Sequence, residues 1–317
     1  MEGLARAVAV MKGFGLMALW ACLIGLAQAP AVSAAQLAVV LSDDSAPYQE
    51  VYDAIRASTN GTVSITHLYA DAVTETALNA RLIVAVGVRA AEAVGGAGGK
   101  IPVLAVLVPK EWYLNSGRTL LTGNGRRVAS ALYLDQPYSR QASLIHWAFP
   151  EAKRVGVLVS AAQAGVHDEI GAALRSRGLI LVGEVLDPRQ KLIEPLERLF
   201  SQSDLMLGVP DAEVFNRTTV QSVLLTSYRY RDPVVGYSRS LTRAGALISL
   251  YSTPTQIGRQ TGELVLKQFE SAYSHLPGPA YPRYFSVSVN QQVARSLGFR
   301  MLSEAELERR LTGNADD

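Results

Sequence analysis

The 317-residue chain has a single cysteine, Cys22, which lies in an apolar N-terminal segment. The rest of the chain therefore forms no disulfide, offers no thiolate to a metal and carries no cysteine nucleophile. Only 18% of the residues are charged, and the lysines and arginines behind the net charge of +2 are scattered. A nucleic-acid partner is not expected, because such proteins gather basic residues on one face.

Groups that could perform catalysis are also sparse. Ser160 lacks the glycine-flanked turn of a hydrolase nucleophile, and the glycines of residues 95–99 do not stand between a strand and a helix as a phosphate loop requires. No metal-ligand spacing relates the four histidines, which are His67, His146, His167 and His275. The sequence predicts neither an enzyme nor a bound cofactor.

The N-terminus has the pattern of a targeting segment. Arg6 and Lys12 precede an apolar run over residues 14–27, and small residues follow at 31–35. We interpret residues 1–35 as a cleaved signal peptide, which predicts a periplasmic protein. An uncleaved anchor is the first alternative, although the apolar run is short for a membrane span. A lipoprotein modified at Cys22 is the second, although the bulky Trp20 stands where small residues are expected.

Strands and helices are expected to alternate from Gln36 onward. Apolar runs without alternation are typical of strands buried on both faces of a parallel sheet. The expected strands are 37–41, 63–67, 82–86 and 102–108, then 155–159, 179–185, 205–208 and 233–237, with shorter extended pieces at 119–122 and 129–134. This pattern predicts an α/β protein with two doubly wound parallel-sheet lobes.

The two series place the lobe boundary near residue 135. We assign residues 36–134 and 246–276 to lobe 1, residues 135–245 and 277–303 to lobe 2, and residues 304–317 to a flexible tail. The chain then crosses between lobes more than once, which predicts a multi-strand hinge. We interpret residues 237–245 as one of these crossings.

Ligands bind beyond the carboxyl ends of strands in open parallel sheets, so the candidate site residues follow the predicted strands. The loops of residues 233–267 carry small and hydroxyl side chains, as expected of a pocket that holds a solute without reacting with it. The candidate ligand contacts are Ser45, Tyr48, Gly87, Val108, Ser160, Gln163, Asp211, Tyr237, Arg239, Ser249 and Tyr251.

Several of these candidates have a purely structural alternative. Asp211 contacts a ligand amino group or only caps the helix that follows it. Tyr48 stacks on a ligand or packs on the sheet edge. Arg239 pairs with a ligand carboxylate or stays solvated in its loop.

An ordered set of short motifs resembles one family. These motifs are 149–158 (FPEAKRVGVL), 209–211 (VPD), 232–236 (DPVVG), 244–249 (AGALIS), 257–262 (IGRQTG) and 289–299. They resemble ABC-transporter substrate-binding proteins of the tryptophan- and tyrosine-binding-like branch, which have the leucine-binding type of periplasmic binding protein fold. The match covers roughly residues 120–301. It departs at 129–132, where Ala-Ser-Ala-Leu replaces the usual Thr-Gly-Val, and at the short loop 160–163.

The resemblance implies an extracytoplasmic binding protein of an ABC-type uptake system, which closes its two lobes on a small solute such as an amino acid. Its expected partners are that solute and an ABC permease in the inner membrane, and a monomer is expected. One alternative is a periplasmic sensory protein that reports occupancy to a membrane receptor or kinase. A hydrolytic enzyme on the same two lobes is the remaining alternative.

Overall fold

The fold of the protein is built on two β-sheets. The structure is a computed structural model, which describes residues 36–75, 78–123, 125–187, 189–270 and 276–313. The first sheet has the strand order β2-β1-β3-β4-β5, and the second has the order β11-β10-β9-β8-β6-β7. The predicted signal peptide, Cys22 and His275 lie outside the described residues. Among the described helices, none combines the length and apolarity needed to span a membrane.

All neighbours in the first sheet are parallel. Its strands are β1 (Leu37–Leu41), β2 (Ile65–Tyr69), β3 (Leu82–Val86), β4 (Val103–Val108) and β5 (Ala129–Tyr133). Every residue of β1 and β3 is buried, as expected for strands covered on both faces.

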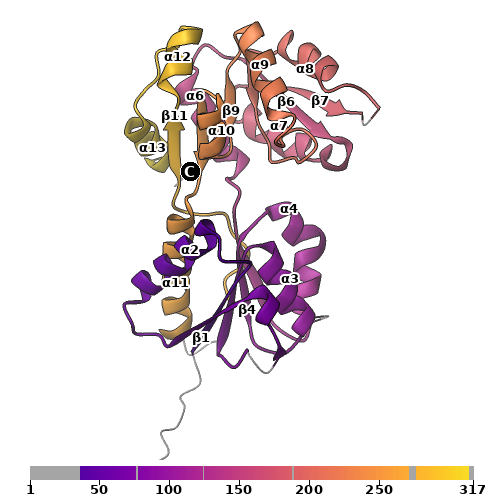
Figure 1. Ribbon diagram of the computed structural model, residues 1–317. Coiled ribbons are helices and arrows are strands. Elements are labelled where there is room, and N and C mark those ends of the chain that lie inside the picture. The colour runs from indigo at the N-terminus through magenta and orange to yellow at the C-terminus, as the bar shows by residue number, and fades with distance from the viewer. Residues whose placement is uncertain (1–35, 76–77, 124, 188, 271–275, 314–317) are drawn as a thin grey trace, which may run out of the picture. The chain divides into compact units, whose positions relative to one another are not determined.

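Helices cover both faces of this sheet. Figure 1 shows α2 and α11 side by side on one face and α3 on the other. The helices of this half are α2 (Ala46–Thr59), α3 (Val88–Ala97), α4 (Lys110–Trp112), α5 (Arg118–Thr122) and, from much later in the chain, α11 (Pro254–Glu270). A π-helical turn, Tyr113–Gly117, joins α4 to α5. The extended piece predicted at 119–122 is wrong, because these residues continue that helical run.

The second sheet repeats the order of the first over five strands and adds one antiparallel strand. Val155 pairs with Leu181 on one side and Leu205 on the other, while Ser249 pairs with Ser288 in antiparallel register. The strands are β6 (Arg154–Ser160), β7 (Ile180–Leu186), β8 (Leu205–Leu207), β9 (Val234–Gly236), β10 (Ile248–Tyr251) and β11 (Ser286–Val289). The helices are α6 (Tyr138–Ala148), α7 (Val166–Arg175), α8 (Ile193–Phe200), α9 (Val220–Tyr230), α10 (Arg239–Ala244), α12 (Gln291–Leu297) and α13 (Glu304–Gly313).

The strand pairings correct two of the predicted boundaries. β10 pairs with β9 and β11, so residues 248–251 belong to the second sheet and not to lobe 1. α10 lies between β9 and β10 of that sheet, so residues 237–245 are not a crossing. The reason is that β10 is the fifth parallel strand of the second sheet and pairs with β9 before the chain leaves that sheet. A third correction concerns Ala280, which was assigned to lobe 2. Its backbone pairs with Ala131 and Tyr133 of the first sheet.

The tail is also more ordered than expected. Residues 304–313 form α13, whose Leu307 and Leu311 are buried in the core of the second half. The Glu304 and Glu308 carboxylates each accept a backbone N–H from β11, at 2.8 Å in both cases. The helix is held because leucines four residues apart share its inner face.

Candidate functional site

A pocket of about 590 Å³ lies where the carboxyl ends of strands from both sheets come together. Its walls include Pro47 and Glu50 of α2, residues 109–111 after β4, and residues 237–240 after β9. The segments that link the two halves add further wall, at 134–136, 251–254 and Tyr281. This volume falls in the range of pockets that enclose a small organic ligand.

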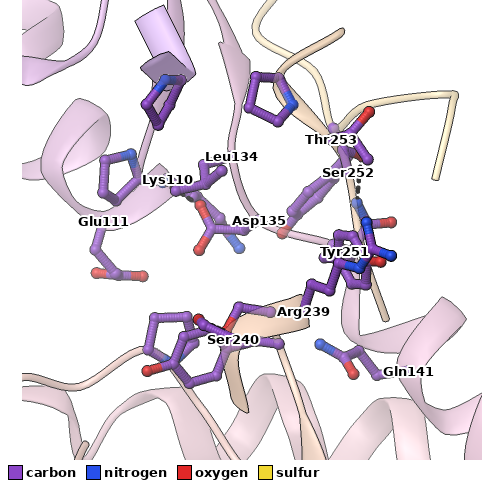
Figure 2. A pocket seen from close by; sticks show the side chains of 18 of the residues that line it. Lys110, Glu111, Leu134, Asp135, Gln141, Arg239, Ser240, Tyr251, Ser252 and Thr253 are labelled. Atoms are coloured by element: carbon purple, nitrogen blue, oxygen red, sulfur yellow. Dashed lines mark hydrogen bonds between the residues drawn. The ribbon is translucent and has the colours of Figure 1, made fainter. Parts of the chain in front are cut away.

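Asp135 is the carboxylate that the fold holds most firmly in this pocket. It lies two residues after the end of β5, and its Oδ2 accepts the backbone N–H of Lys110 at 2.7 Å, at the start of α4. Burial raises the pKa of Asp135, against the lowering effect of the backbone hydrogen bonds. In Figure 2, Asp135 lies with Lys110, Leu134 and Glu111 in the upper part of the view, above Arg239 and Ser240.

Lys110 joins the two halves through its side chain. Its Nζ donates to both carboxylate oxygens of Glu169 on α7, at 2.7 and 2.8 Å, and lies 5.5 Å from the centre of the Tyr281 ring. Burial alone lowers the pKa of Lys110, but the hydrogen bonds with Glu169 and Tyr281 raise it above its usual value. Lys110 is therefore a cation that already has its counter-ion.

Two arginines of α10 differ from Lys110 in this respect. Arg239 and Arg243 both line the pocket and are exposed. Within the described residues, neither guanidinium has a hydrogen-bond or ion-pair partner. The same holds for the carboxylates of Glu50 and Glu111 on the opposite wall. These four charges are available to a bound molecule.

Four tyrosines, Tyr138, Tyr237, Tyr251 and Tyr281, give the pocket its aromatic surface. Burial raises the pKa of the Tyr138 hydroxyl, and the nearby Asp135 carboxylate raises it further. Burial likewise raises the pKa of Tyr237, whose ring packs edge-on against Phe215 at 5.8 Å. The Tyr138 and Tyr237 hydroxyls therefore remain protonated at neutral pH, so each can donate a hydrogen bond to a ligand.

Polar side chains tie the three linking segments to one another. Gln136 Nε2 donates to Ser252 Oγ at 2.8 Å, and Ser252 Oγ donates to the carbonyl of Tyr284 at 2.5 Å. Arg140 Nη1 donates to Gln136 Oε1 at 2.6 Å and to the Pro282 carbonyl at 2.9 Å. The segments therefore form one connected hinge beside the pocket.

Gln141, on the first turns of α6, combines burial with an unpaired polar atom. Its side chain lines the pocket, the residue is only 4% exposed, and Oε1 has no hydrogen-bond partner. Figure 2 shows the side chain directed toward the pocket. Buried amide groups usually find partners, so a bound molecule could supply one.

Three of the eleven residues predicted from the sequence line this pocket. They are Tyr237 and Arg239, which follow β9, and Tyr251, which is the last residue of β10. Strand ends located them correctly, because side chains just beyond a parallel strand face the open edge of its sheet. Their contact with a ligand stays a prediction.

The structure places four other candidates in contacts that hold strand ends together. The buried Asp211 accepts the backbone N–H groups of Ser160, at 2.7 Å, and Glu213, at 2.9 Å. Gln163 Nε2 donates to the carbonyl of Pro210. Gly87 has φ +86°, and a Cβ there would lie 2.5 Å from Ser42 Oγ. None of these four is part of the pocket wall, so the pocket does not support their assignment as ligand contacts.

The remaining four candidates also lie outside the pocket wall. Val108 and Ser249 are completely buried, and Ser249 Oγ accepts a hydrogen bond from Thr242 Oγ1 at 2.6 Å. Tyr48, on the first turn of α2, packs against the first core, and Ser45 is an exposed residue that precedes that helix. Except for the exposed Ser45, these side chains pack into the layers of the fold, which the position at a strand end alone does not predict.

Sequence reasoning missed the pocket residues that belong to helices and linking segments. Asp135, Tyr138 and Gln141 follow the last strand of the first sheet, where the chain leaves it. The residues 135–137, Asp-Gln-Pro, marked a boundary between lobes, and a boundary between lobes is where clefts form. That signal could have identified Asp135.

Comparisons with known proteins agree with this geometry. The sequence profile of the family described as ABC transporter substrate binding protein matches residues 58–301. Among curated proteins, no sequence matches the chain significantly.

Solved structures are similar in fold at low sequence identity. A substrate binding protein with adhesive properties from Clostridium difficile, in a ligand-free, open form, has a TM-score of 0.66 at 15% identity, over 85% of this chain and 96% of that one. An ABC domain in complex with L-Trp from Streptococcus pneumoniae has a TM-score of 0.58 at 16% identity, over 88% and 98%. A conserved domain protein from Vibrio cholerae has a TM-score of 0.59 at 17% identity, over 87% and 98%. The predicted two-lobed periplasmic-binding-protein fold is confirmed.

Proposed function

Because the chain belongs to the ABC transporter substrate binding protein family, we propose that it binds a small organic solute, an amino acid or a similar molecule, between its two lobes and presents it to an ABC permease. The family is one of binding proteins and not of enzymes. The pocket at the shared strand ends carries this proposal, because both halves and all three linking segments contribute to its wall.

Closure of the lobes is the proposed mechanism. A solute that contacts α10 on one side and the start of α4 on the other stabilises the state in which both contacts are made. The ligand shifts the equilibrium by as much as its affinity for the two states differs. The permease then distinguishes occupied from empty protein by the arrangement of the lobes.

We propose lobe limits that follow the strand pairings. Lobe 1 comprises residues 36–134 and 254–276, and lobe 2 comprises residues 135–251 and 286–313, with the remaining segments as the hinge. We further propose that residues 1–35 direct export and that the protein acts in the periplasm. Mass spectrometry of protein recovered from a periplasmic fraction tests this, since a mature chain beginning at Ala35 or Gln36 is expected.

A ligand screen by thermal unfolding tests the binding function. A panel of amino acids, simple amines, carboxylic acids and sugars is added to the mature protein, and at least one class should raise the unfolding temperature. At a ligand concentration about 100 times Kd, the expected stabilisation is about 2.7 kcal/mol. A shift for none of these classes would contradict the proposal.

A matched pair of variants locates the binding site. Tyr251→Ala removes an aromatic side chain from the pocket wall, whereas Tyr228→Ala removes an exposed one from α9. We expect Tyr251→Ala to reduce the ligand-induced shift and Tyr228→Ala to leave it unchanged. Equal shifts in both variants would place the ligand elsewhere.

A further inference from the structure

The charged groups of the pocket are segregated by wall. Glu50, Glu111 and Asp135 come from α2, α4 and the end of the first sheet. Arg239 and Arg243 come from α10 of the second half. The one cation on the acidic wall, Lys110, is already bound to Glu169. One wall is therefore acidic and the other basic.

The acidic wall contains a carboxylate that lacks a cation. Asp135 is held by a backbone N–H and not by an ion pair, and its pKa is raised by burial. A buried carboxylate in this state gains from a cationic group brought within hydrogen-bond distance. Glu111, exposed and one residue after Lys110, adds negative charge to the same wall.

The basic wall has the complementary property. Arg239 and Arg243 are four residues apart, so they project from one face of α10. Neither has a carboxylate partner among the described residues. A guanidinium binds a carboxylate through two parallel hydrogen bonds, which makes an anionic group its natural occupant.

From this arrangement we propose that the solute is a zwitterion, bound in one orientation. Its cationic group lies against Asp135 and Glu111, and its anionic group against Arg239 and Arg243. This inference rests on the proposed binding function and specifies its substrate class. It also assigns the amino-group contact to Asp135 in place of Asp211, whose two carboxylate oxygens are occupied by backbone N–H groups.

A bound zwitterion also explains how the charges couple to closure. Opposite walls attract a molecule that carries both charges, so neither charge on the ligand faces a wall of its own sign. A ligand with one charge satisfies one wall and leaves the other uncompensated. The pocket should therefore discriminate against amines and acids that match an amino acid in every other respect.

Matched ligand sets test the substrate class. Each amino acid that raises the unfolding temperature is compared by calorimetry with its decarboxylated amine and its deaminated acid, for example tyrosine with tyramine and 3-(4-hydroxyphenyl)propionate. We expect each single-charge analogue to bind at least about tenfold more weakly, because one charge-assisted contact is lost. Equal affinity for an analogue, or binding of sugars but of no amino acid, would overturn the zwitterion and leave the binding function standing. Absence of binding by every solute would overturn both.

Variants then test the orientation. Arg239→Gln combined with Arg243→Gln should weaken the amino acid about tenfold or more and leave the affinity of the amine unchanged. Glu111→Gln combined with Asp135→Asn should do the reverse, weakening the amino acid and sparing the deaminated acid. Arg295→Gln, on α12 outside the pocket, is the matched control.

Two results would contradict this orientation. A uniform loss for amino acid, amine and acid in the arginine variant would show that the arginines act on lobe closure and not on the carboxylate. An exchange of the two patterns would show the opposite orientation. Glu111→Gln alone serves if the Asp135 substitution prevents folding, because Glu111 is exposed and accepts no hydrogen bond from the described chain.

Discussion

The two halves of the molecule share the same strand order but complete their outer layers differently. In the first half, α2 is covered by α11, which arrives from the far end of the chain. In the second half, α13, also from the far end of the chain, packs against α6. The comparison shows that one sheet plan accepts two kinds of helix pair.

The two helix pairs differ in how closely their backbones approach. A Cβ at Gly258 of α11 would lie 2.4 Å from the carbonyl oxygen of Val51, and one at Gly262 would lie 2.6 Å from Ser58 Cβ. α6 and α13 instead meet through large side chains, with the Arg310 guanidinium 5.0 Å from the Trp147 ring. Glycines four residues apart thus permit a contact that side chains would prevent.

The two halves also use different side-chain groups for the hydrogen bonds that hold their strand ends in place. In the first half, Ser42 after β1 donates from Oγ to the Val86 carbonyl and accepts the N–H of Ala90. In the second half, Ser160 at the end of β6 gives its N–H to the buried Asp211. One contact uses a hydroxyl and the other a carboxylate, which predicts different sensitivity to substitution.

Filling the close helix contact should have the largest effect. Gly258→Leu forces α11 away from α2, and we expect a loss of about 3 kcal/mol in the free energy of unfolding. Urea denaturation measures this loss. Gly96→Ala is the matched control: nothing lies within 4 Å of the added Cβ, so a gain of up to about 1 kcal/mol is expected from helix propensity. Equal stability of both variants would show that the backbones are not in close contact.

Removal of the Asp211 carboxylate should come next. Asp211→Ala leaves the N–H groups of Ser160 and Glu213 without their acceptor, which we expect to cost about 2 kcal/mol. Ser42→Ala, the counterpart in the first half, removes a neutral hydroxyl and should cost about 1 kcal/mol. The comparison fails if Ser42→Ala is the more damaging, or if Asp211→Ala abolishes ligand binding without loss of stability.

A third difference lies at the amino ends of the strands. Two acids, Asp204 and Asp232, precede β8 and β9, whereas Arg81 and Pro102 precede β3 and β4. Burial raises the pKa of Asp232 to about 6, with a further contribution from the Asp204 carboxylate. Burial also raises the pKa of Asp204, but hydrogen bonds from Arg154 and Lys153 outweigh it and lower the pKa.

Asp232 should make stability fall as pH rises. Its pKa is higher in the folded than in the unfolded protein, so the folded state holds a proton that the unfolded state releases between about pH 4 and 6. The stability lost across that window is about 1 kcal/mol once solvent screening of this half-buried group is allowed for. Asp232→Asn should remove this decline and be the more stable protein at pH 7. Urea unfolding of both proteins at pH 4 and pH 7 checks the sign, and a parallel pH dependence would contradict it.

The ion pair between the halves should have the smallest effect on unfolding. Glu169 is 47% exposed and Lys110 20%, so Glu169→Gln should cost less than about 1 kcal/mol. Added salt should shrink the difference, because it screens exposed charges. Denaturation at low and high salt measures this, and a difference that does not change with salt would argue for a role of Glu169 other than its charge.

Much of the fold could be predicted from local patterns in the sequence. Uninterrupted apolar runs such as 37–41 and 82–86 identified the buried strands, because only a sheet covered on both faces accommodates them. Residues 246–276 were assigned to lobe 1, but β10 within that range belongs to the second sheet. Strand pairing depends on contacts distant in sequence, and nothing in residues 246–250 indicates which strand they pair with.

Three of the residues that line the pocket were predicted from the sequence, and the others were not. Tyr237 and Arg239 follow β9 and Tyr251 ends β10, so a rule based on strand ends identified them. Asp135 and Gln141 join the pocket because the chain leaves the first sheet beside them. Asp211 resembled a ligand contact in sequence, but its carboxylate is buried against Ser160 N–H.

The amino-acid sequence by itself determined the α/β class, the two lobes and the family, because these follow from periodicity and from motifs that are short and ordered along the chain. Only the tertiary structure decided which residues share a pocket, that α11 returns to α2, and that acids and arginines occupy opposite walls. The physical reason is that these arrangements bring together segments more than one hundred residues apart and depend on how whole layers pack. Asp135 and Arg239, for example, line the same pocket.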